Sequence, residues 1–354
     1  MDVPVWGTAD PGETVKVTLN GQTRSTKAGP GGKWMVHLRK LKAGGPYEMQ
    51  VKGKNSITIH DVLVGEVWLA SGQSNMVFTV SKKAASFAGM LDEDKEIAAA
   101  NYPEIRMFTV KESKSYTPQD DPAGEWKVCS PDTVGAFSAV GYLFARDLQQ
   151  RLHVPVGILT VAYGASTAES WLPREALDAD PQLKPMLDRF DTLESFYKTH
   201  PGAMAADAPS GPQTINARPG KPGPLRDPVQ DQHQPTVLFN GMLHSVIPFA
   251  IRGAIWYQGE SIVGGKAGIT LYPQSKCTPS RAIDMVEIYG SQRLWLNCAC
   301  DWGQSDPLAV PKTAIEMKRR GHSEAAIDRL IYGNPLQFLS QNPKFQIQEG
   351  QPPW

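Results

Sequence analysis

The sequence predicts an α/β protein in which a parallel sheet flanked by helices follows a small β-sandwich module. Over residues 1–60, apolar side chains recur at every second position, as in Val15, Val17 and Leu19. This is the period of a half-buried strand. From Val62 onward, nearly continuous apolar runs alternate with helical patterns. Such alternation is typical of parallel strands that helices cover on both faces.

The first module shows several short strands separated by turn residues. Trp34, Val36 and Leu38 alternate with polar residues, and Asn20-Gly21 is a dipeptide typical of hairpin turns. We expect an antiparallel sandwich over residues 1–60 that carries no evident chemistry. A main domain over residues 61–274 and a tail over residues 275–354 follow.

The main domain is predicted to begin with the stretch from Val62 to Met76, which reads VLVGEVWLASGQSNM. Its apolar part, from Val62 to Ala70, fits a strand buried on both faces. Small and amide residues follow this apolar part, and Ser74 is one of them. Because ligands bind beyond the carboxyl ends of parallel strands, Ser74 is a candidate nucleophile. An ordinary Ser- and Gly-rich turn is the alternative.

Further strands and helices follow in alternation. The apolar runs at residues 105–110, 154–163 and 251–257 predict strands, and residues 238–247 predict a helix that Pro248 ends. Ser138 is a candidate cap for another helix. The expected apolar face of that helix consists of Val140, Leu143, Phe144, Leu148 and Leu152.

Three of these strand ends supply residues suited to acyl transfer. This chemistry needs a nucleophilic hydroxyl and hydrogen-bond donors aimed at the developing oxyanion. Ser74 supplies the hydroxyl and its own backbone N–H. Gly164 can bring a backbone N–H close to a substrate because it has no side chain. Gln258 offers a side-chain amide.

The block Gly-Glu-Val-Trp-Leu-Ala-Ser-Gly-Gln-Ser-Asn-Met at residues 65–76 resembles the nucleophile block of the sialate O-acetylesterases, a branch of the SGNH hydrolases. Residues 137–140 (FSAV), 238–249 (LFNGMLHSVIPF) and the strand ends at Gly164 and Gln258 resemble further blocks of that family. The resemblance extends over about residues 5–274. It implies an SGNH-like sheet and removal of acetyl esters from sialic acid or related sugars through Ser74. It also implies that Glu260 orients neighbouring groups.

The same resemblance implies no metal or organic cofactor, an acetylated sugar as the partner, and a secreted, periplasmic or lysosomal location. No signal peptide is evident at the start of this chain, where Met1-Asp2-Val3-Pro4 lacks a basic start and an apolar core. Equal numbers of basic and acidic residues, 36 of each, give no electrostatic reason to expect nucleic acid or an anionic membrane as partner. Four cysteines are too few for a disulfide framework. The oligomeric state is left open.

Two departures from the family pattern leave alternatives open. Ile262 stands where family members carry Asn. No closing block with an acidic residue before a catalytic His follows Gln274, and His322 is a weak candidate for the base because no acidic residue precedes it at the family's spacing. The esterase is therefore expected to be impaired, and a catalytically inactive sugar-binding protein is the first alternative.

The tail resembles a different family. Residues 301–307 (DWGQSDP) and 333–336 (GNPL) resemble the last strand and helix of a metal-dependent amidohydrolase barrel. In that family the residue at the position of Asp301 assists at the metal site, but the upstream His-x-His ligands are absent from this chain. Because one carboxylate does not make a metal site, we expect Asp301 to be structural. The third hypothesis is a metal-dependent hydrolase whose activity resides in the tail.

Overall fold

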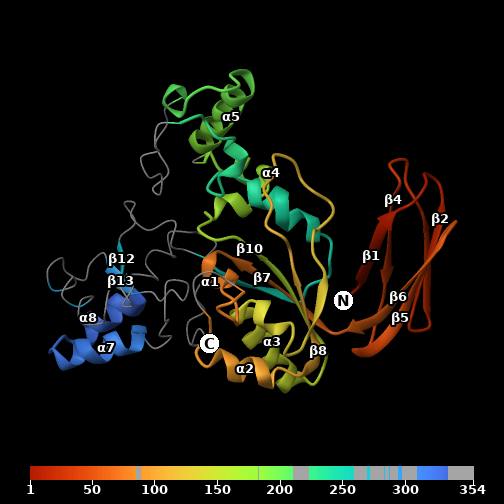
Figure 1. Cartoon of the computed structure of the whole chain (residues 1–354), viewed down its shortest axis with the longest axis horizontal. Helices are drawn as coiled ribbons and strands as arrows, with labels where there is room; N and C mark the ends of the chain where they lie inside the picture. Colours follow the sequence, from red (N-terminus) through yellow and green to blue (C-terminus); the bar gives the residue numbers. More distant parts are fainter. Residues whose placement is uncertain are drawn as a thin grey trace.

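The fold is that of a computed structural model, which describes residues 1–84, 89–181, 183–209, 223–258, 269–271, 283, 287, 294–296 and 309–333. In Figure 1 an antiparallel module lies to one side of a central sheet that helices flank. The predicted α/β class, with a β module before a parallel sheet, is confirmed. None of the helices described has both the length and the apolar character needed to cross a bilayer.

The N-terminal module consists of two antiparallel sheets. In the first, β1 (Val3–Thr8) pairs with β4 (Lys33–Leu38). The second has the order β3-β2-β5-β6, formed by β2 (Thr14–Leu19), β3 (Gln22–Lys27), β5 (Gly44–Lys52) and β6 (Ser56–Val64). Val15, Val17, Trp34 and Val36 form a shared buried cluster, so the alternating residues fill the inside of this module.

The central sheet has the order β11-β7-β10-β8-β9. Its strands are β7 (Glu66–Gly72), β8 (Tyr102–Thr109), β9 (Trp126–Cys129), β10 (Val156–Ala162) and β11 (Gly253–Tyr257). β11, β7, β10 and β8 run parallel, and β9 adds an antiparallel edge. The carboxyl ends of the parallel strands therefore lie at one edge, as the sequence predicts.

The prediction of one strand from Val62 to Ala70 is wrong, because Gly65 divides this run. Val62–Val64 end β6 of the antiparallel module, whereas Val67–Ala70 belong to β7 of the central sheet. A Cβ on Gly65 would lie 1.9 Å from the carbonyl oxygen of Pro155. Only glycine permits that approach, so the chain crosses from one sheet to the other at this residue.

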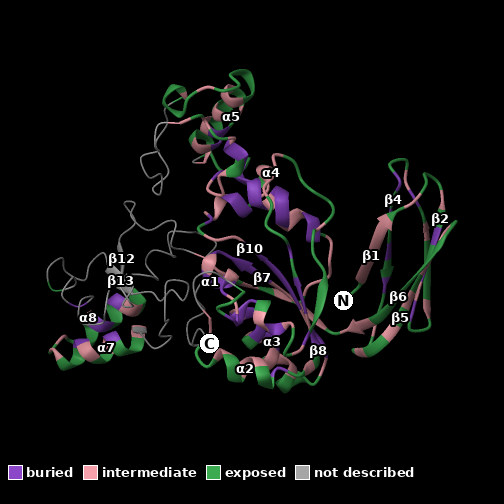
Figure 2. Cartoon of the chain, in the orientation of Figure 1, coloured by how far each residue is buried: buried purple, intermediate pink, exposed green. Residues whose placement is uncertain are grey.

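Buried clusters cover both faces of the sheet, visible as the purple residues along its strands in Figure 2. One face packs against α1 (Ser74–Val77), α2 (Glu93–Ala99) and α3 (Ala139–Leu152). The elements that follow β10 and precede β11 supply the other cluster, with Trp171, Phe190 and Leu238 among its members. These elements are η2 (Glu169–Trp171), α5 (Lys184–Thr199), η4 (Pro228–Gln230), the π-helix η5 (Phe239–Leu243) and η6 (His244–Val246). The short helix α4 (Arg174–Asp178) lies between η2 and α5 in the sequence. Two further 3-10 turns are η1 (Val134–Ala136) and η3 (Ala205–Asp207).

Helix α3 begins where the sequence predicts, and part of its predicted apolar face packs against the core. The hydroxyl of Ser138 accepts a hydrogen bond from the N–H of Gly141 at 3.2 Å, which confirms the cap. Leu143 and Leu152 are 37% and 47% exposed, so their assignment to the apolar face is wrong. A Cβ on Gly141 would lie 3.1 Å from Cε of Met107. Small residues on α3 allow this close approach to the sheet, whereas Leu143 and Leu152 lie toward solvent.

A further parallel pair of strands and further helical segments lie in the described part of the chain beyond β11. β12 (Ile269–Leu271) pairs in parallel with β13 (Leu294–Leu296), and α7 (Ala309–Arg319), α8 (Glu324–Asp328) and η8 (Arg329–Gly333) follow. Ile283, Met317, Ile327 and Leu330 form a separate buried cluster. Asp301, Ile262 and Gln274 lie outside the described residues.

Candidate active site

Three strand ends are aligned in one row at the carboxyl edge of the sheet. Gly72 of β7 pairs with Ala162 of β10 on one side and Tyr257 of β11 on the other. The N–H of Gln73 donates to the carbonyl of Tyr257 at 3.0 Å, and the N–H of Tyr163 donates to the carbonyl of Gly72 at 3.1 Å. The three loops that leave this row therefore start side by side.

Gly72 makes the turn out of β7 possible. Its φ is +139°, and a Cβ there would lie 2.1 Å from the carbonyl oxygen of Tyr257. The chain turns at once into α1, whose first residue is Ser74. Gln73 and Asn75 on either side are buried, whereas Ser74 is partly exposed. The local fold thus leaves the hydroxyl-bearing residue accessible between two buried amides.

The structure brings Gly164 against Ser74. A Cβ built on Gly164 would lie 3.9 Å from Cβ of Ser74. The next residue, Ala165, has a φ of 54°, which is unusual for a residue with a side chain. Such backbone persists only where neighbouring contacts hold it, and it concentrates at functional sites.

Gln258 is one of the groups that hold this loop. Its Nε2 donates to the carbonyl of Ser166 at 3.1 Å. The hydroxyl of Ser166, which is fully buried, accepts a hydrogen bond from Nε1 of Trp171 at 2.9 Å. One N–H of the Gln258 amide is therefore directed to the loop that follows Gly164. Glu260 lies outside the described residues.

Sequence reasoning missed a second polar group near these loops. Nδ1 of His233 lies 2.6 Å from Oδ1 of Asp231. Burial raises the pKa of Asp231, but hydrogen bonds from the ring and backbone N–H of His233 and from Gln234 outweigh it, so that pKa lies below the usual value. The signal was an acidic residue two positions before a histidine, just ahead of the helix at residues 238–247.

The hydroxyl of Tyr163, which follows β10, also has a charged partner. It accepts a hydrogen bond from Nζ of Lys114 at 2.6 Å. The hydroxyl of Tyr116 donates to Oδ1 of Asp227 at 2.5 Å. Burial and this carboxylate together raise the pKa of Tyr116. These two hydrogen bonds therefore connect residues 114 and 116, which follow β8, to Tyr163 after β10 and to Asp227.

The weak candidate His322 has its described partner in the tail. Its Nε2 lies 3.1 Å from Oε1 of Glu287. In the described ranges no group of three or more His, Cys, Asp or Glu side chains is arranged to hold a metal ion.

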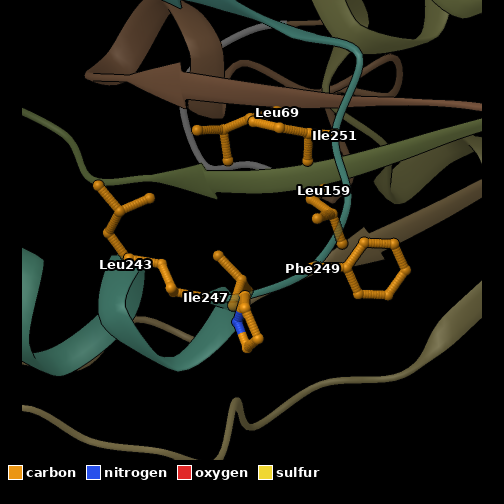
Figure 3. Close-up of a pocket in the computed structure, with 8 residues that line it drawn as sticks. Leu69, Leu159, Leu243, Ile247, Phe249 and Ile251 are labelled. Atoms are coloured by element: carbon orange, nitrogen blue, oxygen red, sulfur yellow. The ribbon is translucent and has the colours of Figure 1, made fainter. Parts of the chain in front are cut away.

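An apolar cavity of about 150 Å³ lies elsewhere on the sheet. Figure 3 shows Leu69, Leu159 and Ile251 facing Leu243 and Ile247 across it. Leu69 pairs with Leu159 in a row three residues before the aligned row at Gly72. Three residues of strand span roughly 10 Å, and the lining is apolar, so this cavity is separate from the candidate active site.

Comparisons with known proteins relate the chain to carbohydrate esterases. It is 32% identical to the sialate O-acetylesterase of Mus musculus and 31% identical to that of Rattus norvegicus, in each case over 73% of this chain and 48% of the relative. A carbohydrate acetylesterase from Xanthomonas citri has a similar structure, with a TM-score of 0.56 and 28% identity over 84% of this chain and 56% of that one. No family model matches the chain.

These similarities support the resemblance of the chain to the sialate O-acetylesterases. They give no support to the amidohydrolase resemblance of the tail. The chain spans about half the length of the curated relatives it matches.

Proposed function

We propose that this chain carries the esterase domain of a protein of the sialate O-acetylesterase family and removes acetyl esters from sialic acid or a related sugar. The observation that carries the proposal is the close approach of Gly164 to Ser74 at the ends of neighbouring strands, where a Cβ on the glycine would lie 3.9 Å from Cβ of the serine. The likeness to carbohydrate esterases over most of the chain supports the same chemistry.

In this mechanism the Oγ of Ser74 attacks the acetyl carbonyl carbon. The backbone N–H groups of Ser74 and Gly164 donate to the oxyanion that forms, and the second N–H of the Gln258 amide supplies a further donor. Collapse of the intermediate releases the sugar hydroxyl and leaves an acetyl group on Ser74. Water then releases acetate. Glu260 orients neighbouring polar groups.

The experiment measures acetate release from O-acetylated sialic acid and from O-acetylated neutral sugars, together with covalent labelling by a fluorophosphonate probe. Ser74→Ala should abolish both release and labelling. The matched control is Ser195→Ala at an exposed position of helix α5, which should behave as the unchanged chain does.

Equal labelling of Ser74→Ala would contradict the choice of nucleophile. Saturable binding of the acetylated sugar without acetate release would instead support the inactive sugar-binding alternative.

A further inference from the structure

Asp231 and His233 form a hydrogen-bonded pair. Oδ1 of Asp231 lies 2.6 Å from Nδ1 of His233 and also accepts the backbone N–H of His233 at 3.0 Å. Oδ2 accepts from Nε2 of Gln234 at 3.2 Å. A carboxylate on Nδ1 places the proton of a neutral imidazole there and leaves Nε2 with a lone pair. This is the arrangement of a general base in a serine hydrolase triad.

The pair lies at the carboxyl edge of the sheet. β11 runs parallel to β7, so the helical segment that leads back to the start of β11 must begin near the carboxyl ends of the strands. Asp231 and His233 come just before that segment. The hydroxyl of Thr167 donates to the carbonyl of His233 at 3.3 Å, and the N–H of Thr236 donates to the carbonyl of Glu169 at 3.1 Å. The pair thus borders the loop that carries Gly164.

The remaining ring nitrogen of His233 is unsatisfied. Nε2 is buried and has no hydrogen-bond partner among the residues that the structure describes, and the side chain is 15% exposed. A buried polar atom without a partner costs about 1–3 kcal/mol. Such atoms are rare in folded proteins and call for an explanation, of which a catalytic role is one.

The other six histidines have different surroundings. His153 precedes β10 and therefore lies at the opposite edge of the sheet. Nδ1 of His244 donates to the carbonyl of Gln119 at 3.0 Å. Oδ1 of Asp120 lies 3.8 Å from the same nitrogen, which is too far for a hydrogen bond. The rest belong to the N-terminal module, the exposed end of α5 and the tail: His37, His60, His200 and His322.

We propose that His233, oriented by Asp231, is the general base of this site. The inference rests on the proposed function. It requires Nε2 of His233 and Oγ of Ser74 to come within about 2.6–3.2 Å in the complex with substrate.

The proton of Ser74 passes to Nε2 as Oγ bonds to the acetyl carbon and the carbonyl electron pair moves onto oxygen. When the bond from carbon to the sugar oxygen breaks, Nε2–H gives that proton to the sugar. In the second half Nε2 takes a proton from water as the water oxygen attacks the acetyl group. The proton then returns to Oγ of Ser74 as acetate leaves.

The test uses the whole chain with His233→Ala, Asp231→Asn and the control His244→Ala. The readouts are hydrolysis of p-nitrophenyl acetate, the rate of fluorophosphonate labelling, and the melting temperature. We expect His233→Ala to slow both reactions by about 10²–10⁴, the range that a general base supplies. Asp231→Asn should slow both reactions at least about tenfold, because His233 is then no longer held in the tautomer with its proton on Nδ1. Added imidazole should restore part of the rate to His233→Ala and leave His244→Ala unchanged.

Rates within about threefold of the unchanged chain in a folded His233→Ala variant would overturn the inference while the proposed function stands. A folded but slow His233→Ala that imidazole does not accelerate would also overturn it, since that pattern indicates a structural role. If His233→Ala fails to fold, His233→Gln replaces it, and the same rate criteria apply. An unchanged chain that neither hydrolyses acetyl esters nor reacts with the probe would contradict the proposed function itself.

Discussion

Gly164 approaches Ser74 so closely that a Cβ on the glycine would lie 3.9 Å from Cβ of the serine. The separation is ordinary van der Waals contact, so a single added carbon fits. A larger side chain would occupy the space above Ser74, where an acetyl group must enter. A larger side chain at residue 164 should therefore affect the reaction more than it affects the stability of the fold.

Gly164→Val is therefore expected to reduce ester hydrolysis by about 10² or more, because it blocks a backbone donor and the approach to Ser74. The free energy of unfolding should change by no more than about 1 kcal/mol, since the residue lies in a loop. The measurements are acetate release and chemical denaturation. Gly31→Val is the control, because nothing lies within 4 Å of a Cβ there. Full activity in Gly164→Val would remove this N–H from the mechanism.

Gly72→Ala should instead impair folding of the central sheet. Its φ of +139° and the 2.1 Å approach to the Tyr257 carbonyl oxygen leave no room for a Cβ without moving backbone. We expect a loss of at least about 3 kcal/mol in the free energy of unfolding. Gly12→Ala, with a φ of +78° and no atom within 4 Å of a Cβ, should lose only about 1–2 kcal/mol. Similar losses in the two variants would contradict the assigned steric contact.

Gln258→Ala removes both the bond to the Ser166 carbonyl and the proposed oxyanion donor. Ester hydrolysis should fall by about 10²–10³ with little change in thermal melting. The matched control is Gln149→Ala, whose amide donates to Oε2 of Glu104 at 3.0 Å on the surface. A loss below about threefold would exclude Gln258 from the site.

Cys129 should be chemically inert in the folded protein. It is 1% exposed, and burial raises the pKa of its thiol to about 11. Because the thiolate is the reactive form, iodoacetamide at mildly alkaline pH should label Cys129 only after denaturation. Peptide mass spectrometry measures this residue separately from the other three cysteines. Rapid labelling of Cys129 in the folded chain would show that β9 opens readily.

The sequence by itself determined the architecture and the main candidate residues. Period-two and continuous apolar runs are local properties, and they predicted the antiparallel module and the parallel strands. The strand ends at Ser74, Gly164 and Gln258 could be placed at one edge because parallel strands share their direction. Local pattern also predicted the cap at Ser138.

Only the tertiary structure decided how these residues are held. The hydrogen bond from Gln258 to Ser166 joins residues 92 positions apart, and the one from Thr167 to His233 joins residues 66 positions apart. The division of the first apolar run at Gly65 depends on the carbonyl of Pro155, from another segment. No local pattern carries such information, because burial, close approach and pairing depend on which distant segments the fold brings together.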